Sequence, residues 1–399
     1  MEKEKNKERI PQLRFPEFKN APAWEQRKLG EVVSAEKKGK AKADMIGDES
    51  VYLDTEYLNG GQIVKVNAVK DTYLDDVIIL WDGSQAGTLY YGFEGALGST
   101  LKAYTISESS LFIYQQLKSR QQIIYEKYRT PNIPHVIKTF LDEFGVYIPS
   151  LPEQKAIGDF FSTLDRSIAL HQRELENLKN RKKSLLQKMF PKNGESVPKI
   201  RFPEFKNAPA WEQRKLGEVA ERVRGNDGRM DLPTLTISAE KGWLDQRERF
   251  SANIAGKEQK NYTLLKQGEL SYNHGNSKLA KYGVVFELQS YSEALVPKVY
   301  HSFRMINDSS ATFIEYMFAT KIPDRELGKL ISSGARMDGL LNINYDEFMG
   351  IRILIPTLAS EQKAIGDFFS TLDRSIALHQ RKLEHLKLRK KALLQKMFP

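Results

Sequence analysis

Residues 153–191 read EQKAIGDFFSTLDRSIALHQRELENLKNRKKSLLQKMFP, and residues 361–399 repeat this stretch with four substitutions. Side chains of one seam recur at alternating steps of four and three residues over about five heptads, which is typical of a coiled-coil helix. The seam of the first copy consists of Ile157, Phe161, Leu164, Ile168, His171, Leu175, Leu178, Lys182, Leu185 and Met189. The seam of the second copy consists of Ile365, Phe369, Leu372, Ile376, His379, Leu383, Leu386, Lys390, Leu393 and Met397. We expect two long helices that pair with each other, rather than two unrelated surface helices.

A shorter repeat opens each of two unique regions. Residues 14–32 and 201–219 both read RFPEFKNAPAWEQRKLGEV, and we call each copy an opening segment. The regions that follow, 33–152 and 220–358, cannot be aligned convincingly. The predicted layout is a first domain at 1–152, a helix at 153–191, a linker at 192–200, a second domain at 201–358 and a second helix at 359–399.

The size of the second domain predicts the direction of pairing. About 37 helical residues rise about 55 Å, whereas a globule of this length has a diameter of roughly 35–40 Å. Such a globule cannot carry the chain back along the whole first helix. The helices should therefore run antiparallel, with one domain at each end and a pseudo-twofold axis between them. His171 and His379 should then lie close together near the midpoint.

Both unique regions are predicted to mix helices and strands, which makes the expected fold class α+β. Alternating or β-branched runs bounded by turn residues predict strands, and apolar residues at helical spacing predict helices. The predicted strands are 61–69, 76–81, 102–106, 144–148, 268–272, 282–286 and 351–355. The predicted helices are 111–128 and 311–319, together with 24–32 and 211–219 in the opening segments.

The composition indicates a soluble protein of the cytoplasm with a polyanionic partner. The chain has 399 residues, no cysteine and a net charge of +10, a balance that favours nucleic acid. The two long repeats carry +3 and +5 of that charge, whereas residues 33–152 carry −3, so whatever that region binds must be bound through a local patch. There is neither an apolar run of membrane-spanning length nor a signal-peptide core.

Motifs for catalysis and metal binding are missing from the sequence. There is no P-loop, no HExxH and no Asn/Asp-Pro-Pro-aromatic motif of adenine methyltransferases. The residues Pro323, Asp324, Glu326 and Lys329 faintly resemble a nuclease motif, but their spacing is wrong and a solvated loop is expected. We therefore expect no catalytic residues and no metal site.

The junctions between domains and helices carry a family resemblance. Each unique region closes with Ile-Pro-x-Leu and runs into Glu-Gln-Lys-Ala-Ile, at 148–157 and 355–365. Together with the two opening segments, this pattern resembles the specificity subunits of type I restriction-modification enzymes over nearly the whole chain. The resemblance implies two target recognition domains, each reading one half of an asymmetric, interrupted sequence in double-stranded DNA. It also implies two methyltransferase subunits and ATP-dependent translocase-nuclease subunits as partners, which would hold S-adenosylmethionine, ATP and Mg²⁺.

Candidate DNA contacts in the first domain lie in three stretches. Basic side chains suit phosphates, and amide or hydroxyl side chains beside glycine can reach base edges. The candidates are Lys37, Lys38, Lys40, Lys42, Trp81, Asp82, Ser84, Gln85, Lys102, Arg129, Asn132 and His135. The alternatives are a solvated lysine run and a plain hairpin turn with Trp81 in the core.

The second domain has candidates after the matching strand and in two arginine-containing stretches. They are Arg222, Arg224, Arg229, Tyr272, Asn273, His274, Asn276, Ser277, Lys278, Lys281 and Arg336. Two other functions remain open at this point. One is a two-ended protein-interaction scaffold, and the other is an autonomous DNA-modifying enzyme.

Overall fold

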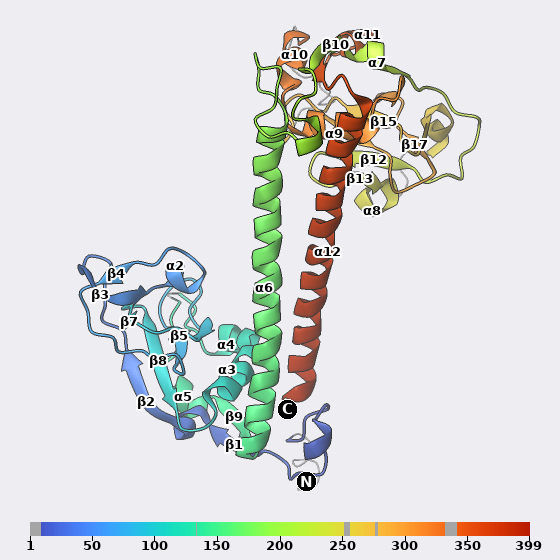
Figure 1. Cartoon of the computed structure of the whole chain (residues 1–399). Coiled ribbons are helices and arrows are strands. Elements are labelled where there is room, and N and C mark those ends of the chain that lie inside the picture. The colour runs from blue at the N-terminus through green and yellow to red at the C-terminus, as the bar shows by residue number, and fades with distance from the viewer. Residues whose placement is uncertain (1–8, 133, 251–255, 276–277, 332–340) are drawn as a thin grey trace. The chain divides into compact units, whose positions relative to one another are not determined.

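The computed structural model describes residues 9–132, 134–250, 256–275, 278–331 and 341–399 (Figure 1). The chain packs into two compact units, Met1–Arg173 with Gln380–Pro399 and Glu174–His379. Each unit therefore combines one unique region with parts of both long helices. In the described part of the chain, none of the helices has the combination of length and hydropathy that a bilayer crossing requires.

The two long repeats form the helices α6, Leu151–Met189, and α12, Ala359–Met397. All of the predicted seam positions are buried or half-buried, which confirms the heptad interpretation. In the first unit Lys390 of α12 forms an ion pair with Asp165 of α6, and in the second unit Lys182 of α6 forms one with Asp373 of α12. In both units the C-terminal half of one helix meets the N-terminal half of the other.

The helices are thus antiparallel within each unit, as the sequence predicts. The proposed approach of His171 and His379 joins residues of different units, and it stays a prediction.

The first domain is built on a four-stranded antiparallel sheet in the order β2-β8-β5-β6. These strands are Val33–Lys38, Leu101–Ile106, Val77–Leu80 and Leu89–Tyr91. A smaller sheet contains β4, β3 and β7, which are Lys65–Val66, Ile46–Leu53 and Ala96–Leu97. The helices are α2, Thr55–Leu58, α3, Ser110–Ser119, α4, Gln121–Lys127, and α5, Phe140–Glu143, with a 3-10 turn at Pro16–Phe18. The predicted strand at 61–69 is thus reduced to the two residues of β4, and the predicted helix at 111–128 breaks at Arg120.

The second domain has a sheet of the same strand order, β11-β18-β15-β16. These strands are Ala220–Arg222, His301–Met305, Leu270–Asn273 and Val284–Glu287. Two ribbons pair β12, Leu235–Ser238, with β13, Gly242–Asp245, and β14, Thr263–Lys266, with β17, Glu293–Val296. The helices are α8, Gln246–Phe250, α9, Ala311–Ala319, α10, Asp324–Lys329, and α11, Tyr345–Met349, with 3-10 turns at Pro203–Phe205 and Gly256–Asn261. The segment predicted as a solvated loop at 323–329 is α10.

The opening segments are strands, not the helices that we expected at 24–32 and 211–219. Glu25–Lys28 forms β1, which pairs with β9, Gly145–Ile148, and Glu212–Lys215 forms β10, which pairs with β19, Arg352–Ile355. Only the last four residues turn, as a 3-10 turn at Leu29–Val32 and as α7 at Leu216–Val219. The correction has a physical reason, because the strand before each long helix supplies hydrogen-bond partners that no local pattern reveals.

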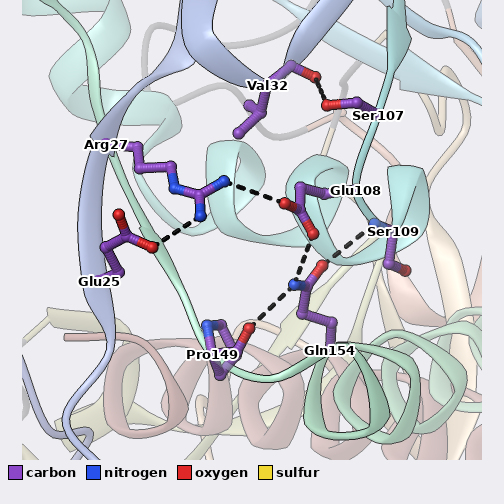
Figure 2. Close-up of polar contacts among 8 residues, drawn as sticks. All are labelled: Glu25, Arg27, Val32, Ser107, Glu108, Ser109, Pro149 and Gln154. Atoms are coloured by element: carbon purple, nitrogen blue, oxygen red, sulfur yellow. Dashed lines mark hydrogen bonds and ion pairs between the residues drawn. The ribbon is translucent and has the colours of Figure 1, made fainter.

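The repeated Glu-Gln pair attaches each domain to its helix. The carboxylate of buried Glu153 accepts hydrogen bonds from Nε and Nη2 of Arg14, each with a donor–acceptor distance of 2.6 Å. Glu361 accepts the equivalent two hydrogen bonds from Arg201. Figure 2 shows the neighbouring contacts of Gln154, whose Nε2 donates to Glu108 and to the Pro149 carbonyl. Its Oε1 accepts the amide of Ser109, the N-cap of α3.

The second unit repeats this arrangement. Gln362 donates to the Pro356 carbonyl and accepts the amide of Ser310, the N-cap of α9. Since Ser109 and Ser310 make the same bond, α3 and α9 are equivalent helices. The two unique regions therefore share a backbone plan, although their sequences do not align.

Candidate nucleic-acid interface

Strand register identifies equivalent positions in the two sheets. Ile79 of β5 lies opposite Lys102 of β8, and Tyr272 of β15 lies opposite His301 of β18. Two residues later come Trp81 and His274, and the carbonyl of each accepts a backbone amide, from Val136 and Leu341 respectively. The loops that follow β5 and β15 are therefore the same structural feature in the two domains.

In the first domain, this loop brings together two stretches that lie far apart in the sequence. The amide of Gly83 donates to the Pro134 carbonyl, and Asp82 forms a β-bridge with His135. Nη1 of Arg129 donates to the Ser84 carbonyl, while its Nε donates to the Tyr125 carbonyl. The predicted candidates Asp82 and Ser84 thus lie beside His135 and Arg129.

Several of these side chains are available to a ligand. Asp82, Ser84, Gln85 and Asn132 are exposed, and His135 is half-buried with Nδ1 3.0 Å from the Thr130 hydroxyl. Asp82 and Gln85 border a hollow of about 630 Å³ whose far wall is formed by α2 and the residues after it. That wall also contributes Asn59, which our sequence reasoning missed, since nothing near Asn59 signals its approach to the loop.

Trp81 and Lys102 form the support of the loop. Nζ of Lys102 lies 3.3 Å from the centroid of the Trp81 ring, and Lys102 also pairs with Glu36. Both side chains are half-buried. A cation held over an indole face fixes the ring, and with it the backbone from which the loop starts. The ammonium group of Lys102 is therefore already in contact with Trp81 and Glu36.

The lysine cluster is only partly available to phosphates. Nζ of Lys37 lies 2.6 Å from a carboxylate oxygen of Asp76, a buried residue, so its charge is matched. Lys38, Lys40 and Lys42 are exposed at the end of β2, which is an edge strand of its sheet. These three lysines form an exposed basic patch on a domain of net negative charge.

In the second domain, two predicted contacts prove to be core residues. Tyr272 is fully buried and donates its hydroxyl to the Tyr282 carbonyl. His274 is also buried, with Nδ1 2.7 Å from the Leu341 carbonyl and Nε2 2.9 Å from the Val299 carbonyl. This burial corrects our expectation for both residues, because their polar atoms are already bound to the protein.

The other predicted residues, at the end of β15 and in the loop that follows it, differ in accessibility. Asn273 is half-buried, donates to the Ile237 carbonyl and accepts the amide of Gly275. Lys278 and Lys281 are exposed. The remaining candidates lie outside the described residues, namely Asn276, Ser277 and Arg336.

A histidine pair takes the place of the Trp81–Lys102 pair. The rings of His274 and His301 stack with centroids 4.9 Å apart, and Nε2 of His301 lies 2.8 Å from the Ile343 carbonyl. Burial lowers the pKa of His301 to about 4. The uncharged form of His301 is therefore favoured at neutral pH. The two loops have equivalent positions but chemically different supports.

A hollow of about 420 Å³ lies at the opposite end of β15, and four basic residues together with Asp227 and Glu269 line it. Arg222 and Arg224 are exposed there, and Lys266 and Arg304 also line it. Sequence reasoning missed the last two, since only strand register places them beside the arginines. Predicted Arg229 is less available, because it forms ion pairs with Asp227 and Glu293.

Comparisons with known proteins agree on one family. A family model described as type I restriction modification DNA specificity domain matches residues 22–180 and again residues 210–388. The chain is 30% identical over 235 residues to the type I restriction enzyme MjaVIII specificity subunit of Methanocaldococcus jannaschii, a match that covers 56% of this chain and 54% of that protein. The chain thus spans about half the length of this relative.

A solved structure shares the fold. The chain superposes on a type I restriction-modification system S subunit from M. genitalium with a TM-score of 0.64 and 16% sequence identity. The superposition covers 98% of this chain and 99% of that one. At this level of identity the likeness concerns the fold alone.

Proposed function

The chain belongs to the type I restriction-modification DNA specificity family, and on that premise we propose that it reads an interrupted, asymmetric sequence in double-stranded DNA. Each recognition domain reads one half of the target. The chain directs adenine methylation and restriction that other subunits carry out, and it has no catalytic site of its own.

The observation that carries this proposal is the pair of equivalent loops with different side chains. The equivalent loops present Asp82, Ser84 and Gln85 in the first domain and Lys278 in the second, where Asn273 is the last residue of the preceding strand. Because base identity is read by the donors and acceptors that a protein presents in a groove, different side chains on one frame give different base preferences. The basic residues beside the loops would hold phosphates and set the position of each domain on the duplex.

The proposed partners supply the chemistry. Two methyltransferase subunits would bind S-adenosylmethionine and flip the target adenine, since its amino group cannot be reached inside the stack. ATP-dependent restriction subunits would use ATP and Mg²⁺, and the assembly would act in the cytoplasm. The proposal assigns no cofactor to this chain.

A binding experiment with controls tests the proposal. The chain is mixed with its methyltransferase partner and titrated at several salt concentrations. The DNA is either a random-sequence pool or the target sequence that is selected from that pool by binding. Selective, salt-dependent binding supports DNA reading, whereas binding without sequence preference supports the scaffold alternative. Methylation of DNA by the chain alone with S-adenosylmethionine would instead identify an autonomous enzyme.

A further inference from the structure

A groove of about 660 Å³ runs beside the last turns of α6 in the second unit. Its floor contains Leu186, Phe190 and Ile322, and its wall contains Ala319, the last residue of α9. Phe190 is buried in the core, while Leu186 and Ile322 are half-buried. The groove therefore offers apolar surface that is large enough for one or two bulky side chains.

Lysines surround this apolar floor. Lys179, Lys183 and Lys192 line the groove and are exposed, and among the described residues none of them has an ion-pair partner. The fourth lysine, Lys182, is matched by Asp373. The groove thus keeps an excess of three positive charges around an apolar floor, which is complementary to an acidic segment with a bulky apolar side chain.

The equivalent place in the first unit is built differently. Counting nine residues from the N-caps Ser109 and Ser310 places Lys118 at the position of Ala319. Nζ of Lys118 lies 3.3 Å from the Leu89 carbonyl and 3.4 Å from Oε1 of Gln121, so its side chain is held against the domain. Burial lowers the pKa of Lys118, and so does the nearby charge of Lys390. A long side chain with its own charge therefore stands where the second unit has a methyl group.

We propose that this groove binds an acidic segment of the methyltransferase subunit through a bulky apolar side chain, and that the two docking sites on this chain are consequently unequal. The proposal rests on the proposed function for the identity of the partner. The site in the second unit binds the first copy of the partner, and the site in the first unit binds the second copy more weakly.

Ala319→Lys is the main test, because it gives the second unit the lysine of the first at an exposed position. Native mass spectrometry and sedimentation measure the stepwise binding of the methyltransferase subunit. Ala319→Lys and the double variant Lys179→Glu/Lys183→Glu should each weaken the first binding step at least tenfold. Arg181→Glu makes the same change of charge on an exposed residue of the same helix outside the groove, and it should leave this step within twofold.

A second measurement identifies the occupant. A photoreactive benzoylphenylalanine at Gln187, an exposed groove residue, is crosslinked in the complex and the attached peptide is sequenced. The expected peptide belongs to the methyltransferase subunit and contains carboxylates around a bulky apolar residue. Equal binding by the wild type and Ala319→Lys overturns the groove proposal, and so does a crosslink to a second copy of this chain. If the wild-type chain binds no methyltransferase subunit at all, the proposed function itself fails.

Discussion

Nζ of Lys390 lies 2.6 Å from Oδ1 of Asp165, and the equivalent pair in the second unit, Lys182 and Asp373, has the same separation. Each lysine occupies a seam position that a leucine would otherwise fill. Polar residues at such positions specify register and direction at some cost in stability. Asp165 also accepts a hydrogen bond from Nε2 of Gln115, and Asp373 accepts one from the hydroxyl of Tyr316. Each ion pair therefore links its domain to the seam.

The first prediction concerns these pairs. Asp165→Ala leaves the mostly buried Lys390 without its partner and should lower the free energy of unfolding by about 1–3 kcal/mol. Adding Lys390→Leu should recover most of this loss, because a leucine suits the seam. Denaturant unfolding of both single variants and the double variant gives the coupling energy. Additive effects would contradict the interaction.

The second prediction concerns pH. Burial lowers the pKa of His301 to about 4 and raises the pKa of Glu315 to about 7. The contribution of His301 to the free energy of unfolding is fully present above its unfolded pKa near 6.5, and it is lost as the pH falls toward 4. The contribution of Glu315 to the free energy of unfolding is fully present below its unfolded pKa near 4.5, and it is lost as the pH rises toward 7. Between pH 4.5 and 6.5 the two therefore cancel.

Single variants should expose each contribution. In Glu315→Gln, the stability of the second unit should fall by about 2–3 kcal/mol as the pH drops from 6.5 to 4.5, and His301→Gln should show the opposite trend. Hydrogen exchange of the β15 amides reports this stability, with the wild type nearly flat over the same range. The same slope in both variants would rule out this assignment.

The third prediction concerns Lys102 and His301, which pack against Trp81 and His274 at the start of the two loops. Lys102→Met keeps the length of the side chain but removes the charge above Trp81, an interaction worth about 1–2 kcal/mol where water is excluded. Discrimination among bases in the first half-site should decline, while that in the second half-site stays unchanged. His301→Gln is the matched variant in the second domain. It should reduce discrimination among bases in the second half-site and leave that in the first half-site unchanged. Competition binding with targets altered in one half separates the two effects.

The fourth prediction concerns phosphate binding by the basic patch. Replacing Lys38, Lys40 and Lys42 by glutamine should reduce the slope of log affinity against log salt by roughly 0.9 for each phosphate that is no longer neutralised. Lys37→Gln should change the slope little, since Asp76 already matches that charge. Without partners, the chain should bind DNA weakly and with a shallow slope. A steep slope for the chain alone would contradict the division of labour between subunits.

Periodicity predicted the long helices because the heptad pattern and the packing express the same constraint. The opening segments could not be predicted in that way, since Glu25 pairs with Ile148 more than a hundred residues away. The likeness of the two unique regions was hidden for a related reason. The two regions share their strand register and the hydrogen bonds that Gln154 and Gln362 accept from Ser109 and Ser310, but they do not share the side chains of their sheets.

The candidate site was predictable as a location but not residue by residue. Register confirms that the loops after β5 and β15 are equivalent, as their sequence positions suggested. Polar residue type alone could not separate exposed Gln85 from buried His274, whose ring nitrogens both lie against carbonyls. Whether a polar side chain faces solvent depends on which distant backbone groups lie beside it.

Mapping methylated adenines after a domain exchange tests the central claim most directly. Residues 33–152 are replaced by the corresponding region of another member of the family, and the methylated sequence is determined in cells that also contain the methyltransferase subunit. The account predicts that one half of the target changes while the other half and the gap between them persist. A change in both halves, or an unchanged target, would contradict independent reading by the two domains.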